Sequence, residues 1–476
     1  MITAFAKKVV KNCGYVIAAA AIALSLSPAM AFAAPTSPTD VGNTMLTVND
    51  LLAGDTVSAY LIADADIDAT NNLTYTMAPG LPAAYDSIDE IAAIASDSAA
   101  FVQNSAMQNA ASVIANSLST PAVTVTATGT SAQLSLGSGY YLVRVTGTNG
   151  ESRVYQSMIV DASPEASNGA YAPRTLTPIG VKKTEVAIEK GVGAAYDEST
   201  NEYSVGDSMP FRISTAVPSY PADARDATFV IGDIPTVGTE IDTASIQLNG
   251  AVAQSGADYT LTASPAGYRI EFTRAYVLAH PGAPIVVTYN AKLTSAAFSR
   301  GPDDLTGNTA TVTFNPNPYS PATASLAGRA KVKTYGYVFT RVTPDGHPLA
   351  GAVFTVTLAN GRQLTSTSDQ NGYVYFEDLA AGTYTAVETT VPSGYRKAPD
   401  QTFNLSEAAC IQDNPATAAN VEDNYLVSTV DVTNPRMFAL PMTGGAGIFL
   451  LSGLGVLLAV VGIALVLFTG EGSIRV

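Results

Sequence analysis

The chain has 476 residues, a formal net charge of -16, 13% charged residues and no Trp. Its surplus of acid excludes nucleic acid and anionic membranes as partners, and its length predicts roughly three domains. Thr, Ala, Val, Gly and Pro abound, which is typical of an all-β surface protein.

The first 33 residues predict a secretory signal peptide. Three lysines precede an apolar core from Tyr15 to Leu26, and small residues allow cleavage between Ala33 and Ala34. The core is too short to span a bilayer, so a retained anchor is the weaker alternative. Cys13 lies inside this segment and leaves Cys410 alone, so we expect no intramolecular disulfide and another source of durability.

Residues 34–175 predict a first domain of strands and helices. Thr56–Ile62 and Ser138–Val145 have strand composition. Ser87 and Glu90 form a capping box that predicts a helix start. A second helix is indicated by apolar residues at helical spacing, namely Met107, Ala111, Ile114 and Leu118. Residues 161–180, rich in Ser, Pro and Ala, are interpreted as a hinge.

Three acids in this region imitate the start of a calcium-binding loop: Asp64, Asp66 and Asp68. The sixth position of the loop is Ala69 rather than Gly, and the twelfth is Tyr75 rather than Glu. We therefore expect a solvated acidic turn. The sequence predicts no metal site and no cofactor.

Residues 176–329 predict a second domain in which buried strand faces carry polar groups. Because successive side chains of a strand point to opposite faces, three strands each place one polar residue among inward apolar ones: Lys190 in Val186–Val192, Asp233 in Phe229–Asp233, and Asn308 in Asn308–Phe314.

Such an arrangement could allow an amide bond to form between two side chains. Burial would lower the pKa of Lys190 and raise that of Asp233. A neutral amine could then attack the side-chain carbonyl carbon of Asn308, with Asp233 as the acid. Ammonia would leave, and an amide would crosslink the first and last strands. The alternative is a buried Lys–Asp ion pair with a hydrogen-bonded Asn.

A family resemblance bears on this choice. Over residues 181–320, three motifs resemble the isopeptide-forming D2 domain of fimbrial major subunits (SpaH/EbpB-type pilins): Val205-Gly206-Asp207, Phe229-Val230-Ile231-Gly232-Asp233 and Gly307-Asn308-Thr309-Ala310. The resemblance implies that Lys190 is the amine, Asn308 the amide and Asp233 the catalytic acid.

Residues 330–438 predict a third domain. Its motifs are Pro348-Leu349-Ala350-Gly351-Ala352-Val353-Phe354, Asp369-Gln370-Asn371-Gly372-Tyr373 and the run from Tyr384 to Tyr395. They resemble the B-type domain of collagen adhesins, a prealbumin-like sandwich. That family has a Lys in the first strand, a Glu and an Asn. Glu388 and Asn434 match, but Arg341 occupies the Lys position.

This substitution changes the expected chemistry. A guanidinium stays protonated in proteins and cannot be the nucleophile. We therefore expect no isopeptide bond in the third domain, and an ion pair between Arg341 and Glu388 instead.

Residues 440–476 begin with a pentapeptide: Leu440, Pro441, Met442, Thr443 and Gly444. An apolar block from Ile448 to Phe468 follows, and a transmembrane helix is expected at about 446–468. This arrangement resembles the LPXTG cell-wall sorting signal, although Arg475 is the only basic residue of the tail. The resemblance implies that a sortase cleaves after Thr443 and passes its carboxyl to an amine. The alternative is an ordinary single-pass anchor.

The receiving amine is the less defined half of such a joint. The family motif Tyr-Pro-Lys between the first and second domains is missing, and Lys182 and Lys183 stand there instead. Counting strand alternation from Lys190 places Lys183 outward and favours it. The alternative is two solvated lysines at a domain junction.

Together these features predict a mainly β chain: tandem immunoglobulin-like and prealbumin-like β-sandwich domains, the first with added helices, and a C-terminal transmembrane helix. The leading interpretation is a pilus subunit fixed to the cell wall, with a sortase, other pilin subunits and peptidoglycan as partners. The alternative is a wall-anchored adhesin or minor pilin that binds a host or bacterial receptor. His280 and His347 lie in unrelated loop contexts, so an enzyme is not expected beyond a single-turnover self-modification.

Overall fold

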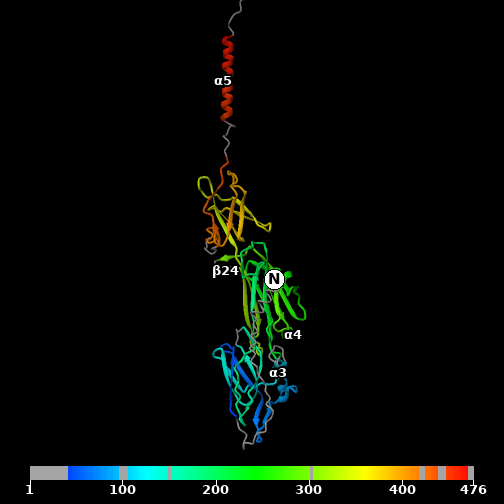
Figure 1. The fold of residues 1–476 in the computed structure, drawn as a ribbon. Coiled ribbons are helices and arrows are strands. Elements are labelled where there is room, and N and C mark those ends of the chain that lie inside the picture. Colours follow the sequence, from blue (N-terminus) through cyan, green and yellow to red (C-terminus); the bar gives the residue numbers. More distant parts are fainter. Residues whose placement is uncertain are drawn as a thin grey trace, which may run out of the picture. The chain divides into compact units, whose positions relative to one another are not determined.

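A computed structural model describes residues 41–95, 106–147, 152–300, 304–416, 424–437 and 446–469. The chain forms two compact units, residues 1–334 with 378–380, and residues 335–377 with 381–476. Each unit is mainly β (Figure 1). The predicted fold class is confirmed. We call the strand residues 44–185 the first domain, 188–332 the second and 335–433 the third.

The first domain consists of two main sheets and two helices. One sheet holds β3 (Leu73–Met77), β2 (Thr56–Ile67), β6 (Gly139–Thr146) and β8 (Met158–Asp161), with β4 (Val123–Thr126) also on β2. The other holds β11 (Ile179–Gly180), β1 (Thr44–Asn49) and β5 (Ser131–Leu136). The helices are α2 (Ile88–Ala95) and α3 (Ala106–Ala115).

Strand β2 supplies both cores of this domain. Val57 and Ala59 enter the core between the sheets, whereas Ile62 packs with residues of the helices. A register shift between Leu61 and Ala63 accommodates this change of face. Both predicted helices are present, and the Ser87 N–H donates to Glu90 at 3.1 Å, one half of the capping box.

The interpretation of residues 161–180 as a hinge was wrong. They contain the hairpin of β9 (Glu165–Ser167) and β10 (Ala170–Ala172), and β11 pairs with β1. Further on, β12 (Lys183–Glu185) pairs with β7 (Arg153–Tyr155). Strand pairing of the first domain thus extends past residue 175, where we had placed its end.

The acidic turn also differs from the expectation. Asp64 and Asp66 are exposed on strand β2, and Asp68 alone lies in the turn that follows.

The second domain is a sandwich of two sheets around one core. The first sheet holds β13 (Ile188–Val192), β15 (Ser208–Ala216), β22 (Pro284–Leu293), β18 (Gln247–Leu248) and β19 (Ala251–Val252), with β17 (Thr239–Ile241) also on β22. The second holds β14 (Ser199–Thr200), β25 (Ala324–Val332), β24 (Asp304–Phe314), β16 (Phe229–Pro235), β21 (Gly267–Phe272) and β20 (Tyr259–Ser264), with β23 (Ser299–Arg300) on β24. A short helix α4 (Arg274–Ala279) and a 3-10 turn at Thr243–Ser245 complete it.

The third domain is a smaller sandwich. One sheet holds β29 (Tyr373–Leu379), β26 (Tyr335–Val342) and β32 (Tyr425–Val427), with β33 (Val432–Thr433) also on β26. The other holds β28 (Gln363–Thr367), β27 (Val353–Thr357), β30 (Gly382–Thr390) and β31 (Gln401–Leu405). Phe339 of the first sheet meets Phe354 of the second edge-on, with ring centroids 5.0 Å apart.

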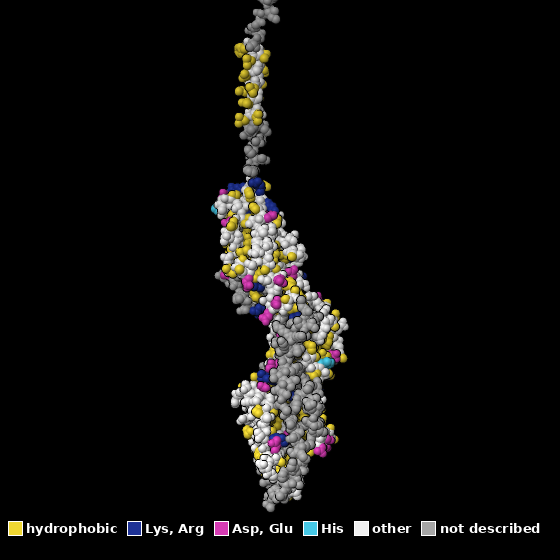
Figure 2. Space-filling view, in the orientation of Figure 1, with side chains coloured by type: hydrophobic (Ala, Val, Ile, Leu, Met, Phe, Trp, Pro, Cys, Tyr) yellow, Lys and Arg dark blue, Asp and Glu magenta, His cyan; other side chains and the backbone are white. Residues whose placement is uncertain are grey.

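Helix α5 (Ala446–Thr469) agrees with the predicted transmembrane segment. Residues Phe449–Phe468 have a mean hydropathy of 2.8, and by length and composition this helix can cross a membrane. Hydrophobic side chains are exposed along it (Figure 2). The signal cleavage position at Ala33 and Ala34, and the sorting motif from Leu440 to Gly444, lie outside the described residues.

Arg174 connects several residues of the segment 161–180, which had been interpreted as a hinge. Its guanidinium forms ion pairs with Asp161 at 3.0 Å and Glu165 at 2.8 Å, and donates to the Ser163 carbonyl at 3.0 Å. Asp161 is buried, so Arg174→Ala would leave its carboxylate inside the protein without a cation. We expect the free energy of unfolding to fall by about 3 kcal/mol. Urea unfolding measures this loss. Arg269→Ala is the control, since its pair with Glu271 is exposed and its loss should cost less than about 1 kcal/mol. Equal effects of both variants would contradict the assigned role.

Candidate functional site

The three polar residues predicted for the second domain come together inside it. Lys190 lies on β13, the edge strand of one sheet, while Asp233 on β16 and Asn308 on β24 lie in the facing sheet. All three are buried, with exposed fractions of 6%, 0% and 0%. The period of two along each strand therefore placed every one of them on the correct face.

A fourth residue, Tyr289 on β22, connects the three. Its hydroxyl oxygen accepts from the Lys190 Nζ at 2.7 Å and from the Asn308 Nδ2 at 2.8 Å. The same hydroxyl donates to Asp233, whose Oδ2 and Oδ1 lie 3.1 and 3.2 Å away. Lys190 also pairs directly with Asp233. The amine and the amide thus hydrogen-bond the same atom.

The electrostatics of the site make the amine easier to deprotonate. Burial lowers the pKa of Lys190 to about 8, against the opposing pull of Asp233. Burial also raises the pKa of Asp233, which Lys190 opposes. The aromatic ring of Phe211 lies 5.3 Å from the Lys190 Nζ and contributes to the dry surroundings. Transfer of the proton from Lys190 to Asp233 would leave two uncharged groups, which low polarity tolerates better.

This arrangement can support amide exchange. Within the described part of the chain, the Asn308 Oδ1 is buried without a hydrogen-bond donor. A protonated Asp233 could polarise that oxygen while the neutral Lys190 attacks the attached carbon. The strand order corrects one expectation, because Asn308 is not on the last strand of the domain. β25 follows β24, so a bond would join the edge of one sheet to the interior of the other.

Tyr289 was missed in the sequence, although a signal for it exists. On β22 the inward face carries buried residues at every second position, namely Ile285, Val287, Tyr289, Ala291 and Leu293. A buried Tyr among aliphatic residues needs a partner for its hydroxyl. The pattern along β22 alone does not show which groups on the facing strands provide this partner.

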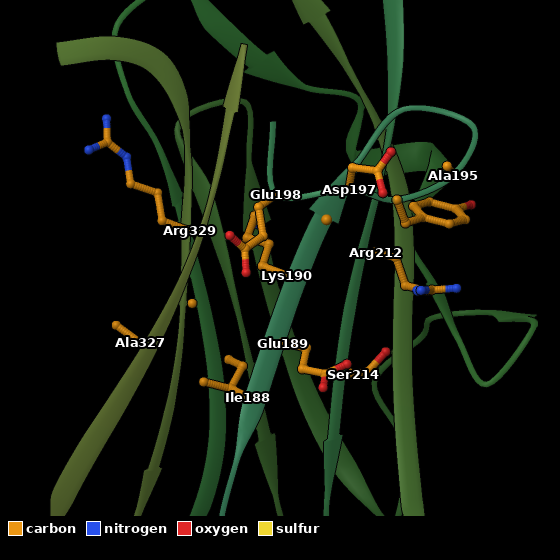
Figure 3. Close-up of a pocket in the computed structure, with 13 residues that line it drawn as sticks. Ile188, Glu189, Lys190, Ala195, Asp197, Glu198, Arg212, Ser214, Ala327 and Arg329 are labelled. Atoms are coloured by element: carbon orange, nitrogen blue, oxygen red, sulfur yellow. The ribbon is translucent and has the colours of Figure 1, made fainter. Parts of the chain in front are cut away.

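A groove of about 680 Å³ runs along the outer side of Lys190's strand. Figure 3 shows Glu189 and Lys190 on β13, and Ala327 and Arg329 on the neighbouring strand β25. These two strands are not paired, yet a Cβ atom at Gly328 would lie 3.3 Å from the backbone nitrogen of Lys190. The groove therefore lies where β13 of one sheet and β25 of the other come close together without being paired.

The third domain repeats the same plan with a different cation. Arg341 on β26, Glu388 on β30 and Asn434 after β33 are all buried. The Arg341 Nη2 lies 3.7 Å from the Glu388 Oε1, which is the expected ion pair. The Asn434 Nδ2 donates to the Glu388 Oε2 at 2.8 Å and Oε1 at 3.0 Å. Burial lowers the pKa of Arg341, and Glu388 opposes this.

The two candidate acceptor lysines have different surroundings. The Lys183 Nζ donates to the Asp50 carbonyl oxygen at 3.3 Å. Burial lowers the pKa of Lys182 to about 8. Lys183 belongs to β12 and Lys190 to β13, and these strands lie in different sheets. Alternation along one strand therefore gives no ground for ranking Lys183 above Lys182.

Metal ligands are not gathered in the part of the chain that the structure describes: no group of three or more His, Cys, Asp or Glu side chains could hold an ion there.

Known proteins share this architecture. Residues 338–417 match the SpaA family model, described as a prealbumin-like fold domain. The T6 backbone pilin of serotype M6 Streptococcus pyogenes, described as a modular three-domain structure, aligns over 84% of this chain and 100% of its own, with 15% identity and a TM-score of 0.63. The full-length major pilin SpaD from Corynebacterium diphtheriae aligns over 83% and 98%, with 16% identity and a TM-score of 0.50. No curated protein matches the sequence.

The chain has the fold of Gram-positive major pilins. The likeness covers nearly the whole of both solved pilins, so it includes all three domains rather than the prealbumin-like part alone.

Tyr289→Phe tests the role of the shared hydroxyl. The variant leaves the buried Asn308 amide and the Lys190 amine without their common acceptor, a loss of about 1–3 kcal/mol. If amide exchange takes place here, we expect it to slow by roughly tenfold or more. Intact-mass spectrometry at increasing times after synthesis would measure the fraction of chains that have lost ammonia. Tyr276→Phe, whose hydroxyl takes no part in the cluster, should behave as the wild type. An unchanged rate in Tyr289→Phe would contradict the assignment.

Proposed function

We propose that this protein is a structural subunit of a sortase-assembled Gram-positive pilus, stabilised by an amide bond between Lys190 and Asn308. The observation that carries the proposal is a buried cluster in which the amine of Lys190, the carboxyl of Asp233 and the amide of Asn308 all hydrogen-bond one hydroxyl group. The fold supports it, because two of the solved proteins that share it are described as a backbone pilin and a major pilin.

The proposed bond forms in one step of amide exchange. The Lys190 Nζ attacks the Asn308 Cγ, the new N–C bond forms, and the bond from Cγ to Nδ2 breaks. Asp233 takes a proton from the amine and returns it to the departing nitrogen, which leaves as ammonia. Lys190 and Asn308 are both consumed, so the reaction turns over once and the protein is not an enzyme in the usual sense.

Polymerisation would join the C-terminal sorting motif of one subunit to a lysine near the junction of the first and second domains of another. A sortase would cleave between Thr443 and Gly444 and pass the Thr443 carboxyl to an amine of another subunit. Lys183 and Lys182 are the candidate amines. The lowered pKa of Lys182 makes it the stronger nucleophile at neutral pH, whereas Lys183 is the one with its amine at the surface.

The proposed location is the cell surface. The signal peptide would export the chain, and α5 would hold it in the membrane until the sortase acts. The last subunit would be transferred to peptidoglycan. A wall-anchored adhesin or minor pilin with a receptor remains the competing function, and the second experiment below separates the two.

Intact mass tests the internal bond. We expect the purified wild-type chain to be about 17 Da lighter than its sequence after removal of the signal peptide, because one ammonia is lost. Asp233→Ala should keep the full mass, since the proton carrier is gone. Glu185→Ala, an exposed residue outside the cluster, should lose ammonia like the wild type. A wild-type mass equal to that of the sequence would refute the bond and leave the buried ion pair as the correct description.

Polymerisation is tested in the producing cell. Wall extracts on a denaturing gel should show a ladder of covalent multimers, and Thr443→Ala should abolish it. Lys183→Arg, Lys182→Arg and the double variant identify the acceptor, because a guanidinium keeps the charge but cannot accept the acyl group. Lys397→Arg, an exposed lysine of the third domain, is the control. A single anchored species in the wild type would favour the adhesin.

A further inference from the structure

Arg341 ties together the strands at the two ends of the third domain. β26 is the first strand of the domain and β33 the last, and they pair in parallel with Arg341 opposite Val432. The Arg341 Nη1 also donates to the Val432 carbonyl oxygen. The first and last strands are therefore held side by side at a single buried guanidinium, with the chain entering at the start of β26 and leaving at the end of β33.

This geometry determines how the domain would carry tension. A pull on the two ends draws β26 by its beginning and β33 by its end. Since the strands are parallel, the pull slides one along the other and loads all bonds between them at once. β32 pairs with β26 in the same sense, with Gly336 opposite Tyr425, and shares the load.

All of these connections are non-covalent. In the described residues, the Arg341 Nε and Nη2 have no hydrogen-bond acceptor, and Nη2 meets Glu388 only at 3.7 Å. A buried ion pair of this kind adds little net stability, because the loss of hydration offsets the attraction. A guanidinium also stays protonated and cannot form an amide. Tension on the third domain is therefore opposed by bonds that break and re-form.

Resting on the proposed function, we infer that the third domain is the extensible element of the pilus subunit. In the polymer, tension would enter at Lys183 or Lys182 and leave at Thr443. Nearly all of the first domain precedes the entry point in the chain and lies outside the load path; only the end of β12 follows it. In the second domain the amide between Lys190 and Asn308 bypasses the residues between them. The third domain alone lies whole in the load path without a covalent bypass.

The third-domain site also retains what a covalent closure requires. Glu388 and Asn434 are buried and in contact, and the Asn434 Oδ1 has no donor among the described residues. A lysine at position 341 would supply the missing amine. Its Nζ would bond to the Asn434 Cγ, the bond from Cγ to Nδ2 would break, and Glu388 would carry the proton to the departing ammonia. Arg341 thus keeps the site unreacted.

Single-molecule pulling tests the inference on the mature chain in detergent, with one handle at position 183 and the other at the C-terminal end, so that the pull follows the proposed load path. The wild type should show a reversible step from the third domain of about 100 residues, or roughly 30 nm. In Arg341→Lys this step should vanish, and the mass should fall by a second ammonia, about 17 Da. The double variant Arg341→Lys with Asn434→Ala should keep the step and lose one ammonia only.

Three results would overturn the inference. A wild-type chain that resists extension of the third domain until rupture has no extensible element there. Two ammonia losses in the wild type would mean that the domain is already closed by another pair. An Arg341→Lys variant that folds, keeps the step and loses one ammonia would show that Arg341 is not what prevents closure. If that variant does not fold, the wild-type step and mass decide. Failure of the proposed function is seen separately, in the wall-extract ladder.

Discussion

The second domain depends on an ionisable pair that water does not reach. Lys190 and Asp233 face each other across the core, with exposed fractions of 6% and 0%. Either charge alone would cost several kcal/mol in this position. Burial shifts the pKa of the amine down and that of the carboxyl up, so the two groups approach one another in proton affinity. The same burial makes the neutral amine easier to form, and the neutral amine is the nucleophile.

Comparison with the third domain shows how much depends on the identity of the cation. Both sites place a cation on one strand and an acid on a second, with an asparagine on a third strand in the second domain and just after β33 in the third domain. In the second domain the amine can lose its proton at a pKa of about 8. In the third domain the delocalised charge of Arg341 persists even though burial lowers its pKa. The same geometry therefore supports covalent chemistry in one sandwich and a reversible contact in the other.

The sequence was informative where structure repeats locally and silent where it depends on distant pairing. Alternation along single strands placed Lys190, Asp233 and Asn308 inward, and an apolar run located α5 to within about one residue. Tyr289 was missed because its role depends on three strands that meet only in the fold. Residues 161–180 were misread because their composition is that of a linker, while Arg174 and the pairing of β11 with β1 hold them in place. The ranking of Lys183 above Lys182 lost its basis, because a change of sheet interrupts the alternation on which it relied, and it stays a prediction.

A covalent bond between Lys190 and Asn308 would stabilise the second domain far more than an ion pair, and the described residues hold no disulfide that could do the same. Closing a loop of about 100 residues in the unfolded chain is worth roughly 5 kcal/mol, and the segment from Lys190 to Asn308 is of that size. A buried ion pair in the same position would contribute close to nothing, since apolar residues of similar volume can replace such a pair without loss of stability. Unlike a disulfide, an amide does not depend on the redox poise of the surroundings. With Cys410 as the only cysteine in the residues that the structure describes, an amide is the covalent closure that this composition allows.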